Sequence, residues 1–242
     1  MTRWLRDAHV VFSMEARRFL KDWQGFAINS LIASATFIML HLMMAPPPET
    51  EVQLLAGAIV FAVGMQSVNV TGSVLVSERF EGQMTLFRTS PMSRGSYVAG
   101  VTVASALTAL LTAAVVLAVA AVAGAEFQPS VLLLPLLIMT ALALPGFAVL
   151  IATHVRTAQS GYMLSSAVGI LVVLVSPIFY PIDRLPEWLQ WVARLSPFTH
   201  AGQAFREVLT GGSSVLLPVV VLLAFMVVTN GLGIARMRWR EP

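Results

Sequence analysis

The chain has 242 residues, of which 57% are hydrophobic and 11% are charged. Because soluble globular proteins carry about 25% charged residues, this composition excludes an ordinary water-soluble domain and indicates a polytopic membrane protein. The formal net charge is +3, and the absence of cysteine excludes disulfides and thiolate metal sites.

Residues 1–25 predict an amphipathic helix that lies in the membrane interface. Apolar and aromatic residues recur at helical spacing from Trp4 to Trp23. Five basic residues lie largely on the opposite side of this helix: Arg3, Arg6, Arg17, Arg18 and Lys21. A basic helix with aromatic residues on its apolar face is typical of interfacial helices. The alternative is a simple positively charged segment that leads into the first span.

Six apolar segments follow, at about 26–44, 54–76, 97–124, 131–152, 161–180 and 215–235. Each is near or above the roughly 20 residues that a helix needs to cross the hydrocarbon core. Unpaired backbone groups are not tolerated in lipid, so these segments must be helical. We therefore predict an all-α integral membrane protein with six transmembrane helices, in one domain that covers residues 1–242.

The distribution of basic residues predicts the orientation. With six spans, both termini and the short tail 236–242 lie on one side of the membrane. All but three of the 15 basic residues fall on that side, and the exceptions are Arg184, Arg194 and Arg206. The positive-inside rule identifies the side with more basic residues as the cytoplasm. The high ratio of arginine to lysine fits a bacterial cytoplasmic membrane.

A charged loop, residues 77–96, separates the second and third spans. Its central part predicts a short amphipathic helix with Met84, Phe87 and Met92 on an apolar edge. Ser90-Pro91 ends this helix, because proline disfavours helical geometry in the residue before it.

Residues 181–214 predict two short amphipathic helices on the outer side, before the last span. Pro186 suits the start of the first helix, and Ser196-Pro197 ends it. The second helix covers about 199–209, and Gly211-Gly212 stops it. The apolar faces follow i, i+3, i+4 and i+7 spacing: Trp188, Trp191, Val192 and Leu195 in the first helix, and Ala201, Ala204, Phe205 and Val208 in the second. The tryptophans predict a position at the lipid–water boundary.

Two motifs carry a resemblance to a known family. The first, Glu-Arg-x-x-Gly followed after seven residues by Ser-Pro-x-Ser-Arg, runs from Glu78 to Arg94. The second, Phe-Tyr-Pro-x-x-x-Leu-Pro-x-Trp-Leu-Gln, begins at Phe179 and is followed by Leu-Ser-Pro-Phe-Thr-His-Ala from Leu195. With the six spans and their order, these motifs resemble ABC-2 type transporter permeases over nearly the whole chain.

The resemblance implies an exporter in which two six-span halves form the pathway and two ATPase subunits power it. The second half is either another copy of this chain or a related permease. ATP and magnesium would be bound by the ATPase, with no cofactor or metal in this chain, which would not be an enzyme by itself. The sequence agrees, because it has no phosphate-binding Gly-x-x-x-x-Gly-Lys-Ser/Thr loop and its only lysine is Lys21.

The resemblance also implies roles for particular segments. The N-terminal helix would be the connecting helix of the family. The residues implied to couple to the ATPase are Glu78, Arg79, Glu81, Gly82, Leu86, Phe87, Arg88, Ser90, Pro91 and Met92. The residues implied to form an external re-entrant hairpin that caps the pathway are Pro181, Leu185, Pro186, Trp188, Trp191, Pro197 and His200.

Polar residues within the spans are candidates for the substrate pathway: Asn29, Gln66, Asn69, Ser73, Ser165 and Ser176. Gln66, Asn69 and Ser73 share one face of the second span, at i, i+3 and i+7. The alternative is that these residues only bridge helices by hydrogen bonds, as Ser, Asn and Gln commonly do in membranes. In the family that the motifs resemble, the second and fifth spans face the seam between the two permease halves, so Gln66 and Asn69 would line the pathway at that seam. Glycines such as Gly64, Gly72 and Gly169 would permit close packing there.

The middle of each span lacks a carboxylate, lysine or arginine, which argues against an ion-driven secondary transporter. Apolar walls with a few neutral polar groups favour a hydrophobic or amphiphilic substrate, such as a drug, an antibiotic or a lipid. An intramembrane serine protease is disfavoured, because Gly-x-Ser-Gly is absent and His41 lacks an evident acidic or serine partner. An ATP-independent transporter and a non-transporting immunity or sensor protein remain as alternatives.

Overall fold

The computed structural model describes residues 3–21, 23–44, 46–80, 92–128, 130–155 and 157–236. The elements in chain order are α1 (Arg3–Lys21), α2 (Trp23–Met44), α3 (Pro48–Phe80), α5 (Arg94–Val122), α6 (Leu133–Ala143), α7 (Pro145–His154), α8 (Ala158–Val175), η1 (Ile182–Arg184), α9 (Glu187–Leu195), α10 (Pro197–Leu209) and α11 (Leu216–Arg236). No strand occurs within these ranges. The all-α prediction is therefore confirmed.

Five segments of the described ranges are long and apolar enough to cross a membrane: Trp23–Met43, Thr50–Phe80, Arg94–Val122, Leu133–His154 and Leu216–Arg236. They correspond to the first four and the last of the predicted spans. The predicted fifth span corresponds to α8, which ends at Val175 rather than at 180 because Pro177 follows two residues later. The prediction of six spans is thus confirmed for five of them.

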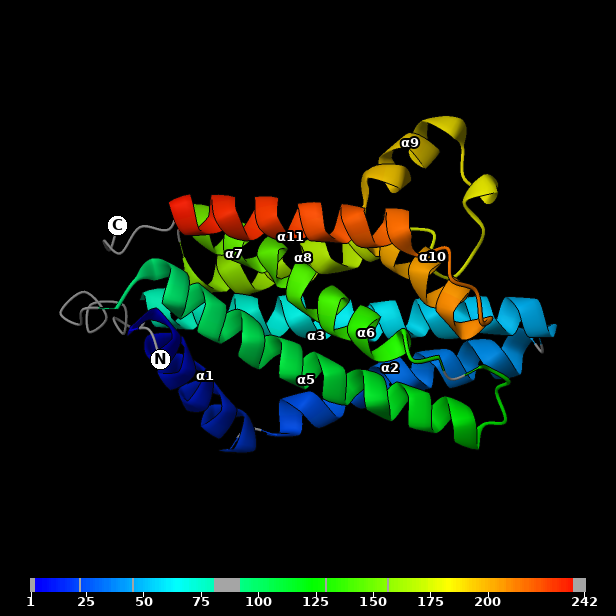
Figure 1. The fold of residues 1–242 in the computed structure, drawn as a ribbon, viewed down its shortest axis with the longest axis horizontal. Coiled ribbons are helices and arrows are strands. Elements are labelled where there is room, and N and C mark those ends of the chain that lie inside the picture. Colours follow the sequence, from blue (N-terminus) through cyan, green and yellow to red (C-terminus); the bar gives the residue numbers. More distant parts are fainter. Residues whose placement is uncertain are drawn as a thin grey trace.

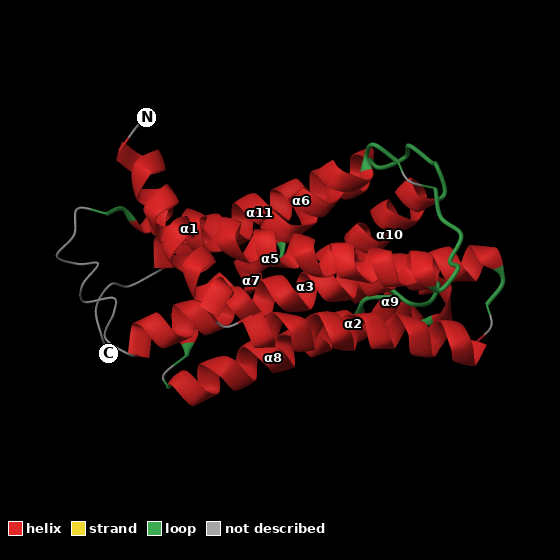
Figure 2. Cartoon of the chain, turned by 90° about the horizontal axis from the view of Figure 1, so that it is seen from below, coloured by secondary structure: helices red, strands yellow, loops and turns green. Residues whose placement is uncertain are grey.

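The helices form an elongated bundle around α3, as Figures 1 and 2 show from two directions. The helices packed against α3 include α2, α5, α6, α7, α8 and α10. α1 begins and α11 ends at the same end of the bundle, whereas η1 and α9 lie at the opposite end (Figure 1). The cavity and the charged cluster described below are built against α3.

α3 is longer than the predicted span at both ends. Its first turn begins at Pro48, and Thr50 N and Glu51 N donate to Pro47 O at 2.9 and 3.0 Å. Proline suits this first position, because its missing N–H has no helical partner there in any case. At the other end α3 continues to Phe80, so Glu78 and Arg79 lie in its last turn and not in a loop.

Glycines allow two other helices to approach α3 closely. A Cβ atom added at Gly64 would lie 2.2 Å from Cε1 of Phe198 in α10. A Cβ atom added at Gly72 would lie 2.7 Å from Oγ of Ser165 in α8. Both glycines are therefore covered by helices of this one chain, whereas the prediction placed them at the seam with a second permease half.

The predicted fourth span is divided into α6 and α7. Pro145 is the first residue of α7 and has no N–H to donate to the carbonyl of Ala141, four residues earlier. Ser67 of α3 donates a long side-chain hydrogen bond of 3.5 Å to that carbonyl. A hydroxyl from the central helix thus takes the place of the missing backbone donor.

The two short helices predicted before the last span are present as α9 and α10. The predicted face of α10 is buried, with Ala201, Ala204, Phe205 and Val208 each 0% exposed. α9 stands away from the bundle (Figure 1), and its Trp188 and Trp191 are each 69% exposed. The re-entrant placement of this pair in the membrane stays a prediction.

The Gly64–Phe198 contact gives a test of how α10 packs on α3. We expect Gly64→Ala to lower the apparent melting temperature, because overpacking a buried site costs about 1–3 kcal/mol. Gly231→Ala in α11 is the matched control, since a Cβ atom there meets nothing within 4 Å and alanine favours helices by about 1 kcal/mol. Fluorescence-detected size-exclusion after heating measures both. Equal melting temperatures for the two variants would contradict this packing.

Candidate functional site

A cavity of about 270 Å³ lies between α1, α2, α3 and α5. Four of the six predicted pathway residues line it: Asn29, Gln66, Asn69 and Ser73. The remaining lining is mostly apolar and includes Phe19, Phe26, Val70, Val101 and Leu107. The structure thus brings the polar face of the second predicted span to the same cavity as Asn29 of the first.

Gln66 is the most buried of these polar residues. Its side chain is 2% exposed, and its Oε1 has no hydrogen-bond partner among the described residues. A buried polar atom without a partner costs about 1–3 kcal/mol. A hydrogen bond from a bound molecule would therefore stabilise the Gln66 amide by removing this cost.

Ser165 and Ser176 lie elsewhere and contact other helices. Ser165 faces Gly72 at the crossing of α3 and α8. Ser176 Oγ lies 2.6 Å from Ser196 Oγ, which links the end of α8 to the junction of α9 and α10. Ser176 therefore fits the alternative of bridging by a hydrogen bond, whereas Ser165 packs against Gly72 with its Oγ lacking a hydrogen-bond partner among the described residues.

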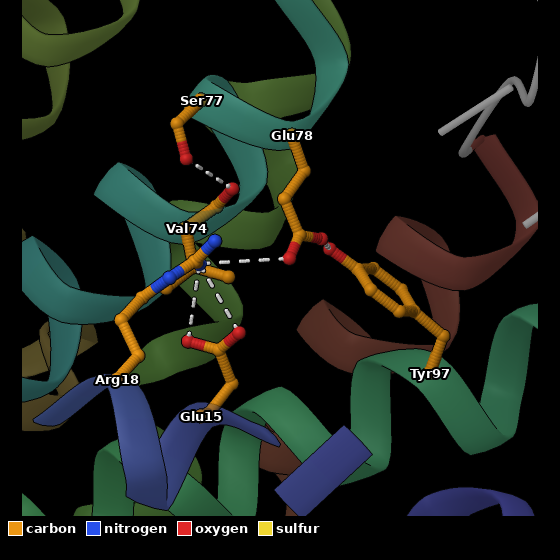
Figure 3. Close-up of polar contacts among 6 residues, drawn as sticks. All are labelled: Glu15, Arg18, Val74, Ser77, Glu78 and Tyr97. Carbon is orange, nitrogen blue, oxygen red and sulfur yellow. Dashed lines mark hydrogen bonds and ion pairs between the residues drawn. The ribbon is translucent and has the colours of Figure 1, made fainter. Parts of the chain in front are cut away.

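A charged cluster borders the cavity and joins α1, α3 and α5 (Figure 3). Arg18 Nη1 lies 3.2 Å from Glu15 Oε1 and 3.6 Å from Glu78 Oε1. The Tyr97 hydroxyl donates a hydrogen bond to the other carboxylate oxygen of Glu78. Glu15 and Arg18 also line the cavity. The cluster therefore connects the cavity wall to the last turn of α3.

Burial determines the chemistry of this cluster. Glu78 is 0% exposed and Glu15 is 6% exposed. A buried carboxylate is costly unless it is paired and hydrogen-bonded, and the guanidinium and phenol provide both. Burial raises the pKa of the Glu15 carboxyl above its ordinary value, and the neighbouring Arg18 guanidinium opposes this rise.

The described residues predicted to couple to an ATPase make contacts within the chain. Glu78 is buried in the cluster. Arg79 Nη1 donates to Ala152 O at 2.5 Å near the carboxyl end of α7, where a positive charge is favourable. Met92 packs against the apolar residues around Val11 and Tyr97. The other predicted coupling residues lie outside the described ranges: Glu81, Gly82, Leu86, Phe87, Arg88, Ser90 and Pro91.

Several of the predicted hairpin residues make hydrogen bonds in the turns on either side of α9. Leu189 N donates to Pro186 O at 2.9 Å, and Gln190 Nε2 donates to Leu185 O at 2.9 Å. His200 Nε2 lies 2.8 Å from Arg194 O. Pro181 precedes η1, and the buried Pro197 begins α10. These contacts define the shape of the hairpin but do not test its role as a cap.

Sequence reasoning missed two residues of the cluster, Glu15 and Tyr97, and one expectation about His41 was wrong. Glu15 follows Ala8 and Val11 at helical spacing, so a carboxylate on an apolar face was the available signal. Tyr97 gave no signal, because its partner Glu78 was assigned to a loop. The expectation that His41 lacks an acidic partner is wrong, since His41 Nδ1 lies 3.1 Å from Glu51 Oε1 of α3.

Comparison with known proteins finds similarity to permeases. The family described as ABC-2 type transporter matches residues 8–210, which include the cavity and the cluster. The chain is 22% identical over 219 residues to YvfS of Bacillus subtilis (strain 168), a protein named as a transport permease. This match covers 88% of the chain and 89% of YvfS. It is 29% identical over 100 residues to the linearmycin resistance permease protein LnrN of the same organism, covering 40% of the chain and 26% of LnrN.

The contact between Tyr97 and Glu78 gives a test of the cluster. We expect Tyr97→Phe to reduce stability by about 1–3 kcal/mol, because the buried carboxylate loses a donor. The apparent melting temperature should fall by several degrees. Tyr162→Phe is the matched control, since Tyr162 is 38% exposed. If both variants melt like the parent chain, the cluster does not hold α5 to α3.

Proposed function

Because this chain belongs to the ABC-2 type transporter family, we propose that it is the permease subunit of an ATP-driven exporter of hydrophobic or amphiphilic molecules. Family membership makes it the transmembrane subunit of an ABC transporter. The proposal adds a separate ATPase subunit in two copies, which binds ATP and magnesium, and a second permease half that is the same chain or a related one. It also places both termini in the cytoplasm of a bacterium.

The observation that carries the substrate class is the lining of the cavity. Its walls are mainly aliphatic and aromatic, with neutral polar groups on α2, α3 and α5 and the charged Glu15 and Arg18 on α1. A ligand site of this kind usually has a volume of about 300–1,000 Å³, and the cavity of about 270 Å³ is near the lower limit. It fits a small drug-like molecule or part of a lipid and is too small to enclose a polysaccharide. The name of LnrN, a linearmycin resistance permease, supports an antibiotic as one candidate.

The position of the predicted coupling segment supports the proposed ATPase contact. Residues 81–91 connect α3 to α5, the two helices that the Glu78–Tyr97 hydrogen bond joins. Glu78 also pairs with Arg18 of α1. A displacement of this segment by a partner would therefore act on three helices that line the cavity. We assign Glu78 a positioning role and propose that residues 81–91, which lie outside the described ranges, make the direct contact with the ATPase.

Co-purification from the native membrane tests the ATPase partnership. We expect a P-loop ATPase to accompany the chain in gentle detergent, and Arg88→Ala to reduce its amount several-fold by removing a charge of the proposed contact. Arg184→Ala is the control, because Arg184 lies in η1 at the opposite end of the bundle. Transport by the purified chain without any ATPase would contradict the proposal and favour an ATP-independent transporter.

Substitutions in the cavity test the pathway. We expect Gln66→Leu and Asn69→Leu to reduce cellular efflux of amphiphilic dyes at least several-fold, since each removes a polar group from the lining. Asn230→Leu in α11 is the control, because Asn230 lies outside the cavity lining and its Nδ2 donates within α11, to Met226 O at 2.9 Å. ATP hydrolysis measured in the same membranes shows whether the ATPase is still assembled. Unchanged efflux of every dye in the cavity variants would exclude this cavity from the pathway.

A further inference from the structure

We propose that the junction of α1 and α2 binds the headgroup of an anionic phospholipid through Arg17 and Lys21. This inference goes beyond the proposed function, because it concerns a lipid of the surrounding membrane and not the transported molecule.

The junction lies at the membrane surface because α2 is a candidate span. α1 ends at Lys21, and the candidate span begins two residues later, at Trp23. α1 runs obliquely to α2 in both views of the chain (Figures 1 and 2). Two residues extend at most about 7 Å, and the headgroup region of a bilayer is about 5–8 Å thick on each side. The end of α1 therefore lies at the depth of the lipid headgroups.

Arg17 and Lys21 form one pair on the side of α1 that faces away from the bundle. The opposite side packs on α5, where a Cβ atom added at Gly100 would lie 2.6 Å from Cβ of Val11. At about 100° per residue, Arg17 and Lys21 lie about 40° apart around the helix. Both are exposed, and no ion pair joins either of them to a described residue. Their positions at i and i+4 allow both cations to contact one anionic group.

An excess of positive charge remains at the junction after the nearby carboxylates are counted. Glu15 and Glu78 are already paired with Arg18, at 3.2 and 3.6 Å. Asp22, between the two helices, lies outside the described residues, and residues 17–22 carry three basic side chains against this one acidic side chain. Charge complementarity therefore favours an anionic ligand.

Exposed apolar side chains beside the pair favour a lipid over another anion. Leu20 is 72% exposed and Trp23 is 59% exposed. Phe19 of α1 contacts Phe26 of α2 edge-on with ring centroids 5.3 Å apart, which links the two helices at the junction. A phospholipid presents a phosphate directly above its acyl chains, so cations next to leucine and tryptophan match both of its parts. Basic amphipathic helices bind anionic membranes through this combination.

Quenching by brominated lipids tests the site on the full chain in vesicles. Because the chain has no cysteine, Gln24→Cys places a single bimane label on the exposed first turn of α2. Leu217→Cys places the same label on the first turn of α11, which begins toward the other end of the bundle (Figure 1). The vesicles contain phosphatidylcholine with either brominated phosphatidylglycerol or brominated phosphatidylcholine at equal mole fractions.

We expect the anionic lipid to associate with the Q24C position about three- to twentyfold more strongly than phosphatidylcholine, since each nearby basic residue contributes up to about fivefold. At the L217C position the two lipids should associate about equally. In 1 M KCl, where the screening length is about 3 Å, the preference at Q24C should fall toward one. This salt dependence needs no substitution of Arg17 or Lys21 and so does not depend on the folding of a variant.

Charge-matched variants identify the residues of the site. Arg17→Gln combined with Lys21→Gln should abolish the preference at Q24C. Arg184→Gln combined with Arg194→Gln, in η1 and α9, removes the same charge at the opposite end of the bundle and should leave the preference unchanged. Equal association of both lipids at Q24C, the same preference at L217C, or a preference that persists without Arg17 and Lys21 would overturn the inference.

Co-purification from the native membrane distinguishes the lipid from the ATPase as the occupant of this surface. If R17Q/K21Q lowers the amount of co-purified ATPase and Q24C shows no lipid preference, the surface belongs to the ATPase and the inference fails. The quenching measurement needs neither ATP hydrolysis nor transport. A salt-sensitive lipid preference in a chain that never co-purifies with an ATPase therefore supports this site and counts against the exporter role alone.

Discussion

The rest of the fold depends on how closely other helices approach α3. In a membrane, lipid tails are as apolar as leucine, so helices associate through close packing and hydrogen bonds and not through the hydrophobic effect. Gly64 and Gly72 provide that closeness for α10 and α8. Ser67 and Thr71 add hydrogen bonds to α6 and α5, the latter through Ser105 Oγ at 2.9 Å. At these four contacts the central helix uses small and hydroxyl side chains, and its large buried apolar side chains, such as Leu54, Leu55 and Ile59, lie elsewhere along it.

The charged cluster extends this arrangement to α1. A carboxylate on the last turn of a long apolar helix would be unfavourable alone, and Glu78 is stabilised by partners from α1 and α5. The same Arg18 that pairs with Glu78 lines the cavity, as does Glu15. Helix α1 therefore takes part both in the ion pair with Glu78 at the end of α3 and in the lining of the cavity. This links the shape of the cavity to the segment that we propose as the ATPase contact.

Residues with a repeating pattern were predicted well. The i, i+3, i+4 spacing identified the buried face of α10, and hydropathy identified five spans. The end of α3 was not predicted, because the charges of Glu78 and Arg79 indicate a loop unless their distant partners are known. The set of Asn29, Gln66, Asn69 and Ser73 was predicted as candidates, and their meeting in one cavity with α1 required the tertiary structure. Pro145 was visible within an apolar run, yet only the structure shows that Ser67 accompanies it.

The proline break between α6 and α7 has a mechanical consequence. A continuous helix resists bending, because each bent turn weakens a backbone hydrogen bond, and an unpaired carbonyl in lipid costs several kcal/mol. At Ala141 that bond is already replaced by the hydroxyl of Ser67, a rotatable side chain on another helix. The angle between α6 and α7 can therefore change while the carbonyl keeps a donor. The fourth span thus has one fewer backbone hydrogen bond that would resist bending at Pro145, and the Ser67 hydroxyl keeps the freed carbonyl paired.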